Sequence, residues 1–293
     1  MEYFLENNEF ITKFDSHGAE LKSVLRKSDY REYMWYGDSK FWGRTSPVLF
    51  PFVGSLKNKE YEFDGRKYPM GQHGFARDME FTLMEKSDNS LAFKLDSNDS
   101  TREKYPFDFS LIITYTLKGG ELTVDWTVTN VGNRTMYFSI GAHPAFLCPI
   151  HGESSKKGYR LYFDGVNSIH HHGNTRDTGL AIMSEDITLP LTDNRVEITP
   201  DFFDRCTYMI EGNQTKLVGI EDIDGNRFVD VCFDTPLFAI WSPEEKNAPF
   251  ICIEPWYGRC DATDFTGDLT KRDYTNTLQP LDVFNGGYSM RFY

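Results

Sequence analysis

An ionisable side chain stands directly before a proline in two apolar segments of this sequence. His143 precedes Pro144. Glu254 precedes Pro255, after an apolar run that begins at Ile251. Proline biases the residue before it to an extended conformation and removes a backbone donor from a sheet ladder. An ionisable group held in this way at the end of a buried strand is costly unless the protein uses it.

A carboxylate and an imidazole can together perform acid–base chemistry. The carboxylate accepts a proton from a hydroxyl group while the imidazole delivers one to another oxygen. A lone histidine before proline is more often a satisfied core residue, whereas Glu254 is harder to explain by packing. We interpret His143 and Glu254 as a candidate pair. The segment 72–77 adds a second imidazole, His73, and a guanidinium, Arg77.

Motifs of other chemistries are missing from the sequence. Neither of the phosphate-binding patterns GxxxxGK[ST] and GxGxxG occurs, nor does HExxH or GxSxG. The run His170 to His172 does not predict a metal site, because consecutive strand residues point to opposite faces. Five cysteines form no CxxC pair. We therefore expect no metal and no cofactor.

Composition narrows the class of protein further. The 293 residues are 40% hydrophobic and carry a formal net charge of −13, which disfavours nucleic acid and anionic membranes as partners. The longest apolar stretch is far short of the roughly 20 residues that cross a bilayer. The acidic start and the odd number of cysteines lead us to expect a cytoplasmic protein. Without a linker or repeat, we predict one domain over residues 1–293.

Alternation of apolar and polar residues with a period of two dominates the chain. Segments 109–117 and 122–128 alternate in this way on either side of Gly119-Gly120, which predicts a β-hairpin. Asp64-Gly65 and Asp224-Gly225 have the same turn chemistry. The best helical candidates are two short segments, 39–45 and 201–206. We predict an all-β fold with large antiparallel sheets, as a sandwich or barrel.

Four motifs in this order resemble the aldose 1-epimerase (mutarotase) family, and within it the LacX-like branch. They are WGRTSPVLFP (42–51), HGFAR (73–77), GAHPAF (141–146) and CIEPW (252–256). The similarity extends over nearly the whole chain. It implies a large antiparallel β-sandwich, the galactose mutarotase-like supersandwich, and an isomerase that needs no cofactor.

The resemblance also implies roles for single residues. Glu254 matches the general base of the family and His143 its general acid. His73 matches a histidine that contacts the sugar, and Arg77 belongs to the same motif. Asp204, in the segment 201–204, matches a substrate-binding acid.

One position departs from the family pattern. Ser55 stands where many relatives have an arginine that binds the sugar. Arg44 or Arg77 would have to supply that guanidinium, although a fixed donor fork is not easily replaced from another backbone position. The departure affects the identity of the sugar more than the type of reaction.

We therefore expect an enzyme that interconverts the α and β anomers of a pyranose aldose, a small-molecule partner. Two alternatives stay open. One is a hexose-6-phosphate 1-epimerase, whose branch has a segment like HGFAR. The other is a sugar-binding or sensing protein without turnover. The sequence specifies neither the sugar nor the oligomeric state.

Overall fold

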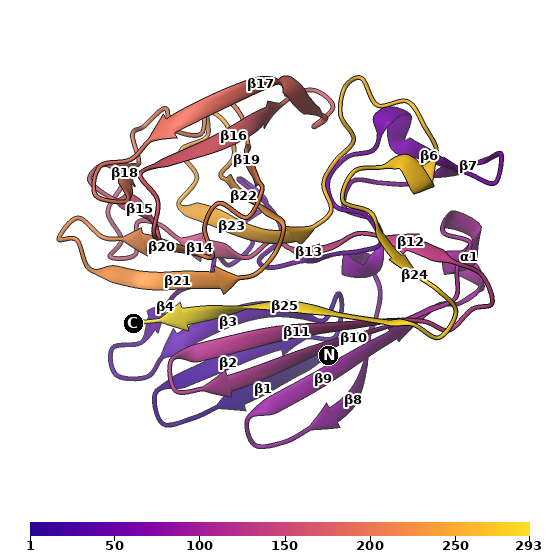
Figure 1. The fold of residues 1–293 in the computed structure, drawn as a ribbon. Coiled ribbons are helices and arrows are strands. Elements are labelled where there is room, and N and C mark those ends of the chain that lie inside the picture. Colours follow the sequence, from indigo (N-terminus) through magenta and orange to yellow (C-terminus); the bar gives the residue numbers. More distant parts are fainter.

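Two large antiparallel sheets dominate the computed structural model, which describes residues 1–293 (Figure 1). The nine-stranded sheet has the order β18-β15-β20-β21-β25-β11-β10-β9-β8. Its strands are β8 (Thr82–Lys86), β9 (Ser90–Asp96), β10 (Phe109–Lys118), β11 (Glu121–Asn130), β15 (Arg160–Phe163), β18 (Arg195–Glu197), β20 (Leu217–Glu221), β21 (Arg227–Phe233) and β25 (Val283–Phe292). The eight-stranded sheet has the order β17-β16-β19-β22-β23-β13-β5, with β14 also paired to β23. Its strands are β5 (Val48–Leu49), β13 (Ile140–Ala142), β14 (Ala145–Leu147), β16 (Ser168–Asn174), β17 (Ala181–Pro190), β19 (Tyr208–Glu211), β22 (Leu237–Trp241) and β23 (Phe250–Tyr257).

Three smaller sheets and four short helices complete the fold. The four-stranded sheet contains β1 (Glu2–Glu6), β2 (Phe10–Asp15), β3 (Glu20–Arg26) and β4 (Arg31–Glu32). The two-stranded sheets are β6 (Glu60–Phe63) with β7 (Arg66–Pro69), and β12 (Met136–Phe138) with β24 (Asn276–Leu278). The helices are α1 (Asp99–Lys104) and the 3-10 turns η1 (Lys57–Lys59), η2 (Ala76–Asp78) and η3 (Leu269–Lys271). None of them is long and apolar enough to cross a membrane.

The predicted hairpins are confirmed. Strands β10 and β11 pair along their whole length around Gly119-Gly120, with Ile113 opposite Trp126 on the buried face. Asp64-Gly65 joins β6 to β7, and both residues have the positive φ that a tight hairpin turn requires. The Asp224-Gly225 turn lies between β20 and β21. The prediction of an all-β antiparallel fold is therefore confirmed.

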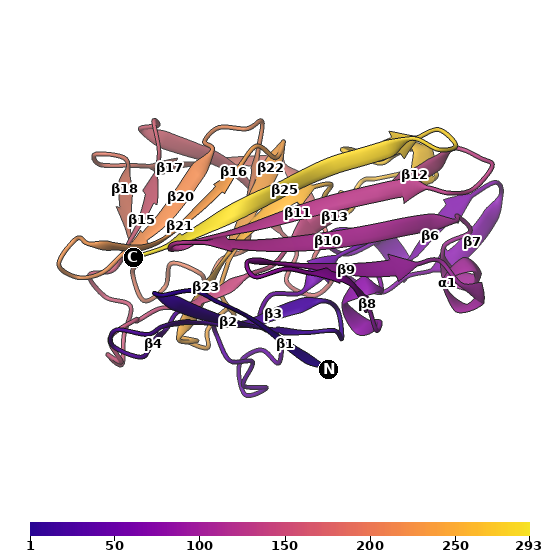
Figure 2. The ribbon, with the colours of Figure 1, turned by 90° about the horizontal axis from the view of Figure 1, so that it is seen from below.

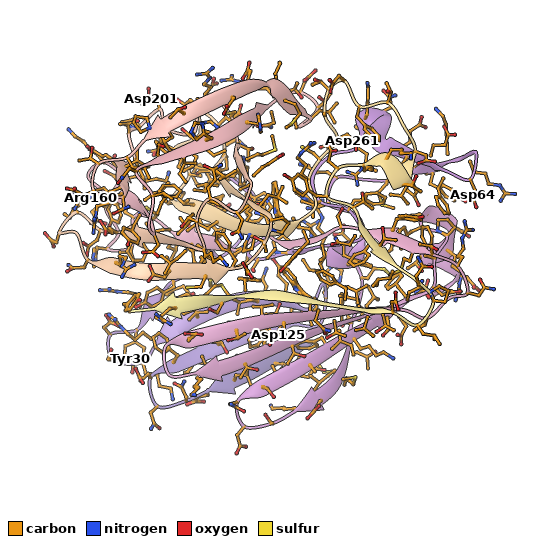
Figure 3. The ribbon with its side chains drawn as sticks, viewed as in Figure 1. Tyr30, Asp64, Asp125, Arg160, Asp201 and Asp261 are labelled. Carbon is orange, nitrogen blue, oxygen red and sulfur yellow. The ribbon has the colours of Figure 1, made fainter.

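One face of the nine-stranded sheet is covered by two other sheets. Phe14 of β2 packs on Tyr115 of β10, with ring centroids 4.6 Å apart. Phe50, next to β5, packs on Phe109 at the other end of β10, at 5.0 Å. Figure 2 shows the four-stranded sheet as a separate layer beside β9 and β10, and Figure 3 shows side chains filling the space between the ribbons. A core of 62 buried residues spans these layers. A single domain stays a prediction, which this shared core supports.

The two helical predictions are wrong. Segments 39–45 and 201–206 form turns instead. In the first, Gly43 interrupts the turn, and the backbone N–H groups of Thr45 and Ser46 donate to the carboxylate of Glu20 rather than to a helical carbonyl. The single α-helix, α1, begins after Asn98, whose side chain accepts from the Thr101 N–H in a capping box.

Gly74 lets the segment that carries His73 approach the backbone of the residue after β5. Its φ is +71°, and a Cβ at this position would lie 2.3 Å from the carbonyl oxygen of Phe50. The N–H groups of Phe75 and Ala76 donate to the same carbonyl, at 3.0 and 3.1 Å. The close approach therefore fixes where the following turn η2 and the preceding His73 lie.

We expect Gly74→Ala to lower the free energy of unfolding by about 3 kcal/mol, because it adds a backbone clash to the strain of a positive φ. Gly65→Ala is the matched control, since Gly65 has a similar φ of +69° but no atom near its missing Cβ. We expect the control to cost only about 1 kcal/mol. Urea unfolding of both variants measures the difference. Equal losses would contradict the close-approach interpretation.

Candidate active site

The pairing of β23 places His143 opposite Glu254. Strands β13 and β14 both pair with β23, one on each side of the dipeptide His143-Pro144. Gly141 faces Trp256 and Ala145 faces Cys252. The same register therefore puts His143 across from Glu254. The proline, which lacks an N–H, stands where the ladder is interrupted.

The two side chains meet in a buried position. Nε2 of His143 lies 3.3 Å from Oε2 of Glu254, and the residues are 7% and 1% exposed. Neither Oε2 of Glu254 nor Nδ1 of His143 has a hydrogen-bond partner in the protein, and the same holds for Nε1 of Trp256. Buried polar atoms are nearly always hydrogen-bonded. Buried polar atoms left unpaired on neighbouring side chains indicate a place for a polar ligand.

Burial disfavours charge on both members of the pair. It raises the pKa of Glu254 well above its usual value. It lowers the pKa of His143 to about 3, and the positive charges of Arg77 and Arg44 act in the same direction. Burial therefore favours an uncharged pair, with one proton on the carboxyl group and a neutral imidazole.

His73 is held as a neutral hydrogen-bond donor. The ring atom Nδ1 of His73 accepts the backbone N–H of Gly54 at 3.1 Å. The backbone N–H of His73 donates to the Gly54 carbonyl at 2.9 Å. An accepting Nδ1 puts the ring proton on Nε2. Burial, with the charges of His143 and Arg77, lowers the pKa of His73 well below its usual value. The ring centroids of His73 and His143 are 5.5 Å apart, so this donor belongs to the same site.

The pair lies in a cleft with a volume of about 1110 Å³. Aromatic side chains surround the imidazole of His143. Trp42 stacks on it with centroids 4.6 Å apart, and Trp241 meets it edge-on at 5.4 Å. The wider lining includes Phe41, Ser55, Lys57, Lys59, Gln72, His73, Arg77, Asn174, Arg176, Asp177, Glu244, Lys246 and Trp256. A cleft of this size, with apolar faces and a few converging polar groups, is typical of a small-molecule site.

The structure brings four of the six predicted site residues together. His73, Arg77, His143 and Glu254 all line the cleft. Arg77 donates through Nη2 to the carbonyl of Gln72 at 2.7 Å, and its buried Nε has no partner.

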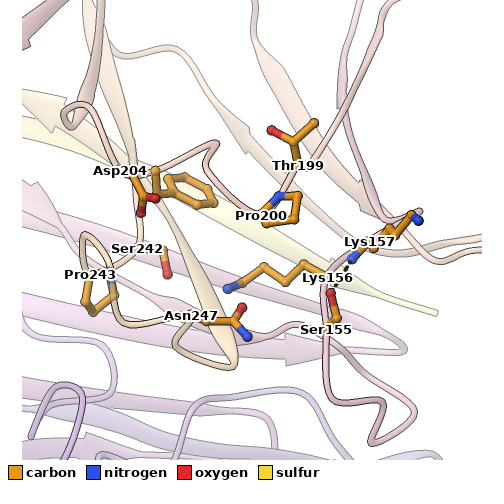
Figure 4. A pocket seen from close by; sticks show the side chains of 10 residues that line it. Ser155, Lys156, Lys157, Thr199, Pro200, Asp204, Ser242, Pro243 and Asn247 are labelled. Carbon is orange, nitrogen blue, oxygen red and sulfur yellow. Dashed lines mark hydrogen bonds between the residues drawn. The ribbon is translucent and has the colours of Figure 1, made fainter.

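Arg44 and Asp204 are absent from the lining of this cleft, and their contact with a sugar stays a prediction. Arg44 is turned to Asp78, with Nη2 and Oδ1 2.7 Å apart. Asp204 lines a small neighbouring pocket with the buried ammonium group of Lys156 (Figure 4). The carboxylate of Asp204 accepts the backbone N–H of Glu245 at 2.8 Å, and this hydrogen bond holds the loop that contains Glu245 at the rim of the cleft. The sequence pattern around 201–204 resembled the family too little to place this side chain.

Ser55 lines the cleft where many relatives have an arginine. Its hydroxyl oxygen lies 2.9 Å from the position that a Cβ on Gly179 would take, so the loop between β16 and β17 rests against it. Of the two arginines considered as replacements, Arg77 alone reaches the cleft. A third, Arg176 on that loop, was not foreseen. It lines the rim and pairs with Glu244 at 3.2 Å.

One group of side chains is close enough together to be considered as a metal site. It consists of His143, Cys252 and Glu254, whose potential ligand atoms lie within 4.8 Å of one another. Burial raises the pKa of the Cys252 thiol well above its usual value, and Cys252 is absent from the cleft lining. A protonated thiol is a poor ligand, so we assign no metal ligands here. In the histidine run, His170 is exposed and His171 is buried on Tyr208, as strand alternation predicts.

Sequence and structure comparisons identify relatives of this chain. A family model described as aldose 1-epimerase matches residues 1–272. Protein LacX of Lactococcus lactis subsp. lactis, in its plasmid form, is 30% identical over 293 residues, with 97% of each chain covered.

Solved structures extend the similarity to the fold. A galactose mutarotase related enzyme from Lactobacillus acidophilus is 35% identical with a TM-score of 0.93, covering 100% of this chain and 97% of that one. A galactose mutarotase-like protein from Lactobacillus casei is 31% identical with a TM-score of 0.91, and both chains are fully covered. The predicted galactose mutarotase-like fold is confirmed.

We expect the ring of His73 to stay neutral, with its proton on Nε2, from about pH 5.5 to about pH 8, because burial disfavours the imidazolium form. Long-range 1H–15N correlation spectra report both the charge and the tautomer of each histidine ring. Spectra of the urea-unfolded chain provide the reference. A His73 signal that titrates near the ordinary histidine pKa of about 6.5 would contradict the assignment.

Proposed function

This chain belongs to the aldose 1-epimerase family, and on that premise we propose that it interconverts the α and β anomers of a pyranose aldose. The observation that carries the proposal is the buried pair of His143 and Glu254, whose Nε2 and Oε2 atoms are 3.3 Å apart beside unpaired polar atoms in a large cleft. This is the arrangement that proton transfer to and from one sugar ring requires.

In the proposed reaction, the carboxylate of Glu254 accepts the proton of the anomeric hydroxyl while the imidazolium of His143 donates a proton to the ring oxygen. The C1–O5 bond breaks, and its electron pair takes that proton as C1 becomes an aldehyde. Rotation about C1–C2 then presents the other face of the carbonyl. Reclosure with both transfers reversed gives the opposite anomer. Only protons move, so the reaction calls for no redox cofactor.

The single proton of the pair supports both roles. Burial favours protonated Glu254 with neutral His143, and transfer of that proton from Oε2 to Nε2 yields the carboxylate and imidazolium that the reaction uses. The net charge of the pair does not change in this transfer, and the attraction between the two new charges offsets part of the desolvation cost of forming them in a buried site. Trp42, stacked on the imidazole, stabilises its positive charge through the face of the indole.

The remaining cleft residues are suited to hold the sugar. His73 offers a fixed Nε2–H donor, and Arg77 has a buried Nε without a partner. Trp241 and Trp256 offer apolar ring surface to the C–H face of a pyranose.

The five free cysteines are consistent with a reducing compartment, and we propose the cytoplasm as the location of the protein.

A phosphorylated sugar is the second candidate substrate, because cationic side chains gather in the cleft. Lys57, Lys59 and Lys246 line it together with Arg77 and Arg176. A phosphate group binds where several such donors converge. Exchange with glucose 6-phosphate but not with glucose would select this candidate. Saturable sugar binding without faster exchange would instead identify a sensing protein.

We expect Glu254→Gln to reduce anomer exchange by about 10²–10⁴-fold, since it keeps the side-chain volume and removes the base. His143→Asn should cause a loss of similar size. Polarimetry of freshly dissolved α-glucose and α-galactose, or NMR exchange spectroscopy, measures the rate. Glu32→Gln is the control for folding damage, because Glu32 is a half-buried carboxylate that accepts the Val24 N–H in the four-stranded sheet. Unchanged exchange in Glu254→Gln would refute the proposed mechanism.

We expect kcat/KM to be flat from about pH 5 to about pH 8. The active pair carries one proton. Burial lowers the pKa at which the pair takes up a second proton, and it raises the pKa at which the pair loses its last one. Activity should therefore fall only below and above this window. Rates corrected for spontaneous mutarotation test this, and an acid limb centred near pH 6.5 would contradict it.

A further inference from the structure

Asp261 lies behind the cleft and bonds to both segments that form one wall of it. Its N–H donates to the carbonyl of Ser55 at 3.0 Å, and its Oδ2 accepts the N–H of Lys57 at 2.9 Å. Its own carbonyl accepts the N–H of Ala181, the first residue of β17, at 2.9 Å. Figure 3 labels Asp261 in the part of the molecule where these segments approach each other. One residue thus ties the segment 54–57 to the start of β17.

Arg272 holds the side chain of Asp261 in place. Its Nε donates to Oδ1 at 2.6 Å, and the two side chains are only 3% and 4% exposed. The same guanidinium donates through Nη2 to the carbonyl of Arg259 at 2.9 Å and lies over the ring of Phe52 at 5.0 Å. A buried ion pair with several further contacts has a fixed geometry, and loss of one partner leaves the other charge unpaired.

The segment 54–57 connects Asp261 to the candidate sugar donor His73. Gly54 makes two hydrogen bonds to His73: its N–H donates to Nδ1 of the ring and sets the tautomer, and its carbonyl accepts the backbone N–H of His73. Asp261 fixes the other end of this segment at Ser55 and Lys57. Displacement of the segment would therefore move the Gly54 N–H that keeps the ring proton on Nε2.

We propose that Asp261, held by Arg272, is a positioning residue that fixes this cleft wall and, through it, His73. Its effect on sugar turnover rests on the proposed function, while its effect on His73 does not. A carboxylate is suited to this position because each of its oxygens faces a donor: Oδ1 faces Nε of Arg272, and Oδ2 faces the backbone N–H of Lys57. An asparagine would turn an NH₂ group toward either Arg272 or the Lys57 N–H and lose one bond.

Asp261→Asn tests the proposal. We expect KM for glucose or galactose to rise about tenfold to a hundredfold with a much smaller change in kcat, because a shifted wall weakens binding of substrate and transition state alike. We also expect a second tautomer of the His73 ring in 1H–15N spectra. If this variant does not fold, Arg272→Lys serves instead, since it keeps the charge but loses the planar fork, and it should change both readouts in the same direction.

Glu221→Gln is the matched control. Glu221 is also a buried carboxylate in an ion pair, with Arg195 Nε at 2.9 Å, and it lies on β20 of the nine-stranded sheet. We expect it to lower the thermal midpoint without changing KM or the His73 signal. A folded Asp261→Asn with unchanged KM and a single His73 tautomer overturns the proposal. If the parent chain shows no anomer exchange, the proposed function fails, and the His73 spectra still decide this inference.

Discussion

The site depends on one constraint of strand pairing. Two short strands, β13 and β14, pair with the same neighbour, β23, on either side of a two-residue gap. Antiparallel register leaves no freedom in what faces the gap, so His143 must lie across from Glu254. Proline in the gap removes the donor that would otherwise continue the ladder. The distance between the two side chains is thereby set by the hydrogen bonds of a sheet, which is more rigid than a loop.

The surroundings of His143 and Glu254 determine which charges the two side chains can carry. Both side chains are buried, so charge on either group is disfavoured unless the other compensates. Trp42 and His73 then act on the same imidazole from two sides, one by stacking and one at the ring edge. Neither Arg77 nor Arg44 favours a second proton on the pair. Burial and these charges therefore favour a pair that carries one proton.

The sequence predicted the sheets and the pair of His143 and Glu254 better than the residues around that pair. Hairpins were readable because alternation and Asp-Gly or Gly-Gly turns are local signals. His143 and Glu254 were readable because an ionisable residue before proline in an apolar run is costly to keep. The contact of Asp204 with the Glu245 N–H was not predicted, since which way a turn residue points depends on its tertiary neighbours. Asp261 gave no local signal, because its partners Ser55 and Ala181 are distant in the chain.

The rim of the cleft is formed by loops, whereas His143 and Glu254 are positioned by paired strands. Arg176, Glu244 and Asp204 come from separate loops and are joined by side-chain bonds at the surface. Glu254 lies within β23, and His143 lies between two strands that pair with β23. Loops of this kind tolerate substitution and insertion far better than paired strands do. Substitutions in these loops can therefore reshape the mouth of the cleft and change its charge while the spacing of His143 and Glu254 stays fixed.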